Sequence, residues 1–128
     1  PKKLKNYIIS DNSFYMDKSY ANSINDLKIY FKKSECVQAF SYDLAIFYLL
    51  NKKSCSKFFN VWVIGSKKNQ EIYINELKLN RPKYILKGGV TYFQPLEERY
   101  PYINNFIQKE YFLYDKIGLW NIFKINNL

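Results

Sequence analysis

The sequence predicts an α/β fold, specifically a three-layer Rossmann-like sandwich with a mostly parallel sheet and a C-terminal antiparallel hairpin. Three short apolar runs, at 36–40, 58–64 and 83–87, alternate with segments of helical periodicity. This alternation implies parallel strands joined by right-handed crossovers. The 128 residues are the usual size of one domain. We assign 1–16 to a lead-in from a longer chain and 17–128 to a single α/β domain.

Helices are expected before and between these strands. Residues 17–33 carry apolar side chains at helical spacing, such as Ile24 and Leu27. A short apolar helix is expected over 44–50, followed by a polar loop. A second long helix is expected over 67–79, and Pro82 ends it because proline cannot continue a helix.

The last third of the chain predicts a short helix and a hairpin. The helix is expected near 102–108. Two strands, 111–115 and 119–125, flank a turn that contains Gly118, which is typical of a β-hairpin. Near the start of the chain, 7–9 form either a short strand or an entry segment.

The composition limits the chemistry of the chain. The net charge is +9, which fits an anionic partner such as nucleic acid. However, the lysines are scattered and only two arginines occur, whereas phosphate and base recognition usually depends on arginine forks. A cytosolic basic nucleic-acid-binding protein is therefore the alternative function, and lysine spread over a solvated surface is the simpler interpretation.

The chain contains no histidine. Ser-His-Asp and Cys-His catalysis are therefore excluded within it, and two cysteines without histidine do not make a four-ligand zinc site. Neither a dinucleotide-binding glycine motif nor a P-loop motif occurs. We expect no catalytic residue, no metal and no cofactor in this chain.

Turn residues follow the predicted strands, and ligands of open parallel sheets bind beyond the carboxyl ends of the strands. Three segments lie there: Ser41-Tyr42-Asp43, Gly65-Ser66-Lys67 and Gly88-Gly89. They predict a small-anion or sugar site, and ordinary turn and cap chemistry is the alternative. The candidate ligand-binding residues are Ser41, Asp43, Ser66, Lys67, Gly88, Gly89 and Arg99.

Acidic and aromatic residues give two weaker hypotheses. Asp43, Glu97 and Glu98 would serve a stand-alone small enzyme only if two carboxylates were set at a defined gap. The clusters Tyr92-Phe93 and Tyr100-Pro101-Tyr102 are candidate surface aromatics. These aromatics would bind sugar rings, a membrane interface or the rest of a parent protein.

Cys36 and Cys55 are the only two cysteines. One begins a predicted strand and the other lies in the loop before the next strand, so both would lie toward the same edge of the sheet if these strands are neighbours. We predict a disulfide, which would indicate an oxidising compartment. The alternative is two unpaired thiols in a reducing compartment.

Several segments together resemble the soluble C-terminal domain of GT-C-type membrane glycosyltransferases of the dolichyl-phosphate-mannose-protein mannosyltransferase group. The matching pieces are Cys36-Val37, Tyr48-Leu49-Leu50, Cys55-Ser56-Lys57-Phe58, Pro82-Lys83-Tyr84-Ile85 and the hairpin 111–125. The resemblance covers roughly residues 18 to 125.

The resemblance implies a non-catalytic accessory domain, periplasmic or lumenal and attached to the membrane in the full-length protein. The catalytic acid and the polyprenyl-phosphate sugar donor of such enzymes belong to the membrane part, so no catalytic residue is carried over to this chain. The implied partners are the membrane domain of the same parent chain and a glycan, a protein or a lipid-linked sugar.

Overall fold

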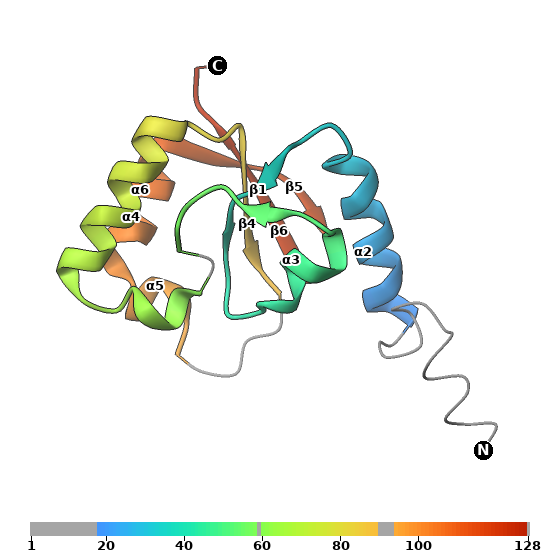
Figure 1. The fold of residues 1–128 in the computed structure, drawn as a ribbon, viewed down its shortest axis with the longest axis horizontal. Coiled ribbons are helices and arrows are strands. Elements are labelled where there is room, and N and C mark those ends of the chain that lie inside the picture. The colour runs from blue at the N-terminus through green and yellow to red at the C-terminus, as the bar shows by residue number, and fades with distance from the viewer. Residues whose placement is uncertain (1–17, 59, 90–93, 128) are drawn as a thin grey trace.

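A computed structural model describes residues 18–58, 60–89 and 94–127 (Figure 1). Its elements, in chain order, are α2 (Lys18–Tyr30), β1 (Cys36–Val37), β2 (Ala39–Phe40), α3 (Ala45–Leu50), β3 (Lys53–Ser54), the 3-10 helix η2 (Val61–Val63), α4 (Lys67–Asn80), β4 (Tyr84–Gly88), α5 (Leu96–Arg99), α6 (Pro101–Glu110), β5 (Tyr111–Ile117) and β6 (Trp120–Ile125). The expected lead-in 1–16 and the candidate strand 7–9 lie outside the described residues.

The principal sheet is mixed rather than mostly parallel. Its strand order is β2-β4-β6-β5, in which only β2 and β4 pair in parallel, whereas β4–β6 and β6–β5 are antiparallel. A separate two-stranded parallel sheet joins β1 to β3. The predicted Rossmann-like sandwich with a mostly parallel sheet is therefore wrong, and the fold is a mixed α/β one.

The first reason why the sheet is not mostly parallel is that the predicted strand 58–64 does not form. The hydroxyls of Ser54 and Ser56 donate hydrogen bonds to the carbonyl oxygen of Phe58, at 3.3 and 2.8 Å. The side chain of Asn60 accepts a hydrogen bond from the backbone N–H of Trp62 at 2.9 Å and starts the 3-10 helix η2. These local side-chain bonds occupy backbone groups that a sheet ladder would need, and they outweigh the β-propensity of the aromatic residues.

The second reason is that the predicted strand 36–40 is divided between the two sheets. Cys36–Val37 pair with β3, and Ala39–Phe40 pair with β4. Between them, Gln38 is buried, its side-chain amide donates to the hydroxyl of Tyr73, and its carbonyl accepts from the N–H of Leu86 at 2.9 Å. The segment therefore contributes only two residues to the principal sheet, and β6 occupies the other side of β4.

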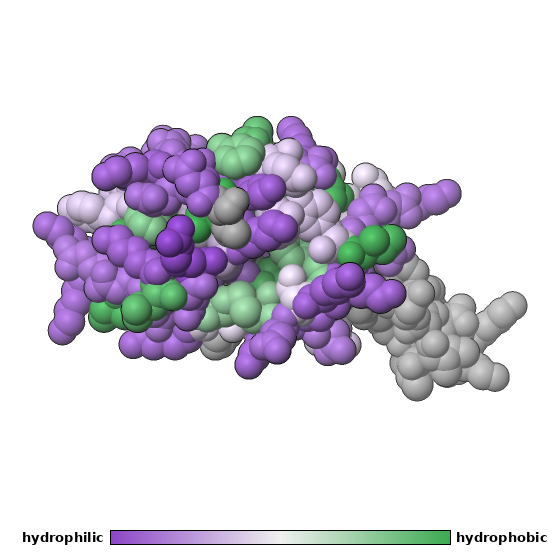
Figure 2. All heavy atoms as spheres, turned by 90° about the horizontal axis from the view of Figure 1, so that it is seen from above, coloured by the Kyte–Doolittle hydropathy of each residue, from purple (hydrophilic) through white to green (hydrophobic). Residues whose placement is uncertain are grey.

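Helices lie on both sides of this sheet (Figure 1). On one face, Leu86, Trp120 and Ile122 form a core with residues of α2 and α3. On the other face, Ile85, Ile125 and Phe40 form a core with residues of α4, α5 and α6. In Figure 2, hydrophilic residues cover most of the face seen from above, and hydrophobic residues form separate small groups there.

The predicted helices form with small boundary differences. The helix expected over 17–33 is observed as Lys18–Tyr30 and the one over 44–50 as Ala45–Leu50. In α4, Ser66 accepts a hydrogen bond from the N–H of Asn69 at 3.1 Å, and Arg81 adopts a left-handed conformation just before Pro82. These are ordinary start and stop signals, and they explain why this helix was predictable.

The C-terminal hairpin is also confirmed. β5 and β6 pair antiparallel over 111–117 and 120–125, and Gly118 has a φ of 58° at the turn. A register shift between Leu113 and Asp115 marks a β-bulge in β5. A bulge of this kind changes the direction of the side chains next to it.

Candidate binding site at the carboxyl ends of β2 and β4

Four of the predicted site residues come together where β2 and β4 end. These two strands are parallel neighbours, with Phe40 opposite Lys87, so the residues that follow them meet at one sheet edge. The hydroxyl of Ser41 donates a hydrogen bond to the carbonyl of Gly88 at 2.5 Å, and the N–H of Asp43 donates to that same hydroxyl oxygen at 3.0 Å.

Tyr20 of α2 completes this site, and we call Tyr20, Asp43, Gly88 and Gly89 together the Asp43 group. The hydroxyl of Tyr20 donates a hydrogen bond to the Asp43 carboxylate at 2.6 Å, across 23 residues of sequence. Sequence reasoning did not include Tyr20, because nothing in the local pattern shows that α2 packs against the turn after β2. Asp43 is partly exposed, and the Tyr20 bond uses one of its two carboxylate oxygens.

The two glycines allow the chain to pass close to its neighbours. Gly89 has a φ of +75°, and a Cβ atom there would lie 2.6 Å from the ring of Trp120 and 3.1 Å from Asp43 Cβ. Gly88 has a φ of +117°, and its Cβ would lie 2.4 Å from the carbonyl oxygen of Leu119. Glycine is therefore required at both positions for a conformational and a steric reason.

The chemistry of this edge suits hydroxyl groups better than anions. The Asp43 carboxylate accepts hydrogen bonds and repels negative charge. Ser41 is buried and both of its hydrogen bonds are internal, so it holds the turn in place. Of the two ligand classes expected for this edge, a sugar hydroxyl fits the arrangement and a small anion does not.

The other predicted site residues have separate partners. Ser66 caps α4 through its hydrogen bond with Asn69. The Lys67 Nζ atom lies 5.4 Å from the centroid of the Tyr102 ring. The Arg99 guanidinium lies 4.9 Å from the Trp62 ring. These contacts are a helix cap and two cation–π pairs. None of the three contacts is made with a residue of the Asp43 group.

Lys87 is a further polar residue that sequence reasoning missed. It is half-buried on β4, and its Nζ atom donates a hydrogen bond to the side-chain oxygen of Asn104 at 2.7 Å. Burial lowers the pKa of Lys87, and the nearby Glu97 carboxylate partly opposes that shift. The available signal was a lysine within an apolar strand, which indicates either an edge position or a buried polar partner.

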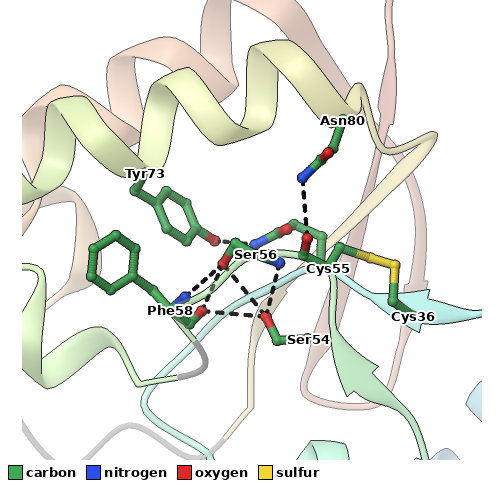
Figure 3. The surroundings of a disulfide bond; sticks show 8 residues. Cys36, Ser54, Cys55, Ser56, Phe58, Tyr73 and Asn80 are labelled. Carbon is green, nitrogen blue, oxygen red and sulfur yellow. Dashed lines mark hydrogen bonds between the residues drawn. A yellow bond between two sulfur atoms is a disulfide. The ribbon is translucent and has the colours of Figure 1, made fainter.

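The predicted disulfide is present. Cys36 of β1 and Cys55, just after β3, are bonded with 5.0 Å between their Cα atoms and a separation of 19 positions in sequence (Figure 3). The N–H of Cys55 donates to the carbonyl of Val37 at 3.2 Å, and the Asn80 side chain donates to the carbonyl of Cys55 at 3.1 Å. The disulfide thus ties β1 and β3 to each other next to the end of α4.

The aromatic predictions have a mixed outcome. Tyr100 is buried in the core rather than exposed, and burial raises its pKa to about 12. Tyr102 is 44% exposed, as expected of a surface residue. The Tyr92-Phe93 pair lies outside the described residues. A different exposed group, Phe112 and Tyr114 on β5, was not predicted.

Comparisons with known proteins found no matching family model, no matching curated protein and no matching solved structure. The resemblance to a glycosyltransferase domain therefore stays a prediction from the residues themselves. Within 18–58, 60–89 and 94–127, no helix has the length and apolar character needed to cross a bilayer. The same residues contain no cluster of three or more acidic or cysteine side chains that would hold a metal ion.

Proposed function

We propose that this chain is a non-catalytic extracytoplasmic domain, periplasmic or lumenal, of a membrane glycosyltransferase. The membrane part would belong to the same parent chain. The observation that carries the proposal is the Cys36–Cys55 disulfide. Structural disulfides persist in oxidising compartments and are rare in the cytosol. Both cysteines also belong to the segments that resemble the C-terminal domains of these enzymes.

The role that we propose for the domain is to contact the acceptor beside the membrane-embedded catalytic part. The group formed by Asp43, Tyr20, Gly88 and Gly89 supports this role, because it places a partly exposed carboxylate at a glycine-lined sheet edge. Such a group accepts hydrogen bonds from the hydroxyls of a glycan or of a protein acceptor.

Mass spectrometry of the endogenous protein, taken from the membrane fraction of its source cells, tests this proposal. We expect peptides of this domain to belong to a larger chain that also contains several hydrophobic membrane spans. A full-length protein that consists of these residues alone would contradict the proposal.

A sugar-transfer assay on that parent protein tests the role of the sheet edge. The Asp43→Asn variant is expected to raise the KM for the acceptor and leave kcat nearly unchanged, because the carboxylate would bind acceptor without taking part in the reaction. Asp26→Asn, on the exposed side of α2, is the matched control. A large loss of kcat in Asp43→Asn would contradict a purely binding role.

Nucleic-acid binding is the second candidate, favoured by the net charge of +9. It predicts association with single or double strands that weakens steeply as salt rises, because bound counterions are released from the phosphates. Absence of binding to either form at low salt would eliminate this candidate.

A further inference from the structure

Aromatic and basic side chains form a row across three strands of the principal sheet. Tyr84 on β4 is directly opposite Lys124 on β6, and Lys124 is directly opposite Phe112 on β5. Residues that are opposite each other in register point to the same face of a sheet. We call Tyr84, Lys124, Phe112 and Tyr114 the aromatic–lysine row.

Tyr114 joins this row through the bulge in β5. The register shift between Leu113 and Asp115 leaves Tyr114 as the extra residue of the strand. Its ring centroid lies 5.8 Å from that of Tyr84 and 6.2 Å from that of Phe112, and the Lys124 Nζ atom lies 4.8 Å from it. The bulge therefore adds a third aromatic ring on the same face.

The inner end of the row is fixed by packing. Tyr30 and Phe31, at the end of α2, contact the Tyr84 ring in edge-on geometry, with centroids 5.1 and 6.1 Å away. Farther along the same face, Leu86 and Ile122 are fully buried beneath the helices. The row thus begins where the helical cover ends, and its rings have a rigid base.

The outer end of the row is open to solvent. Phe112 is 46% exposed and Tyr114 is 49% exposed, and their ring planes meet at 75°. Two exposed rings at this angle form the walls of a corner. Exposed aromatic rings that lie together, with an apolar face and a polar edge, are a feature of binding surfaces.

Charged groups of both signs lie beside this corner. The Lys124 ammonium, beside the Tyr114 ring, is a hydrogen-bond donor group. The exposed Asp115, opposite Ile122, lies on the same face as the row, and one of its carboxylate oxygens accepts a hydrogen bond from the N–H of Lys116 at 2.7 Å. A sugar has apolar C–H faces that pack on aromatic rings, and hydroxyls that use a donor and an acceptor at once. A nucleic acid would place its phosphates near Asp115, where like charges repel.

We propose that the aromatic–lysine row binds an oligosaccharide, with sugar rings on Phe112 and Tyr114 and hydroxyls bonded to Lys124 and Asp115. This inference rests on the proposed function only in placing the domain in a compartment where glycans are available. It concerns a different surface from the Asp43 group, because Lys124 and Tyr84 lie at the opposite end of β4 from Gly88.

Nuclear magnetic resonance titration of the isotopically labelled chain tests this site. Three uncharged saccharides, mannotetraose, N-acetylchitotetraose and cellotetraose, are added separately. We expect at least one of them to shift the amide signals of Phe112, Tyr114 and Lys124. Loss of one stacked ring in Tyr114→Ala or Phe112→Ala should weaken that binding by about tenfold.

Two controls separate binding from folding and from exposure alone. Both substituted side chains are about half exposed, so each variant should remain folded, with a thermal unfolding midpoint lower by only a few degrees. Tyr48, on α3, is 76% exposed, and Tyr48→Ala should leave the affinity unchanged.

Four results would overturn the inference. The first two are the absence of a shift with any of the three saccharides and an affinity that neither alanine variant changes. The third is tighter binding of oligothymidine through the same residues. The fourth is a dimer in sedimentation that Tyr114→Ala dissociates. None of these results bears on the membrane-fraction analysis above, so the site and the proposed function fail independently.

Discussion

Removal of the disulfide gives the most quantitative prediction about this fold. The Cys36→Ala/Cys55→Ala variant loses a cross-link between residues 19 apart in sequence. In the chain-entropy relation, a closed loop of this size lowers the stability of the unfolded state relative to the folded state by about 3 kcal/mol. The variant should therefore unfold with a free energy lower by roughly that amount.

Urea unfolding followed by circular dichroism measures this difference. With a typical slope of about 1.5 kcal/mol per molar urea for a small domain, the midpoint should move down by about 2 M. Reduction of the original chain by dithiothreitol should lower its midpoint by a similar amount, and the same reagent should leave the double-alanine variant unaffected.

Equal midpoints for the original chain and the double-alanine variant would refute this reasoning. Such a result would mean that the unfolded chain already keeps the segment from β1 to β3 compact without the cross-link. A steeper slope in the double-alanine variant would indicate in addition that its unfolded state is less compact without the cross-link.

Three further predictions concern the buried polar and glycine positions. Gly89→Ala should destabilise the chain by about 2 kcal/mol or more, because Gly89 has a positive φ and a methyl group there would lie 2.6 Å from the buried Trp120 indole. The control Gly65→Ala has open space around it and should change the unfolding free energy little. Tyr73→Phe should cost about 1–2 kcal/mol in urea unfolding, because it leaves the buried Gln38 side chain without its hydrogen-bond partner. Stability should fall as pH rises from 10.0 toward about 12, because burial raises the Tyr100 pKa above its ordinary value and the unfolded state loses this proton first. Tyr100→Phe should reduce that alkaline loss, because it removes the group that titrates. An unchanged alkaline slope would contradict this assignment.

Sequence signals that act locally were sufficient for the helices and the hairpin. Ser66 and Pro82 bracket α4 because capping and the missing proline N–H depend on adjacent residues only. Gly118 marks the hairpin turn for the same reason. The disulfide prediction was also correct, although the neighbour of β1 is β3 rather than the strand expected over 58–64.

Strand propensity and patterns that depend on distant partners were not sufficient. The aromatic and β-branched residues of 58–64 are typical of a strand, but hydrogen bonds from the side chains of Ser54, Ser56 and Asn60 to nearby backbone groups replace it. The aromatic–lysine row was equally hidden, because its three strands come from separate parts of the chain and one ring enters through a bulge. Tyr100 was misassigned to the surface because burial of a tyrosine depends on the packing of α5 against the sheet.

The redox state of Cys36 and Cys55 in the native cell tests the extracytoplasmic placement most directly. Cells are quenched in acid, the protein is alkylated under denaturing conditions before and after reduction, and labelled cysteines are counted by mass spectrometry. The proposed placement predicts that both cysteines are labelled only after reduction. Labelling of both cysteines before reduction would contradict it.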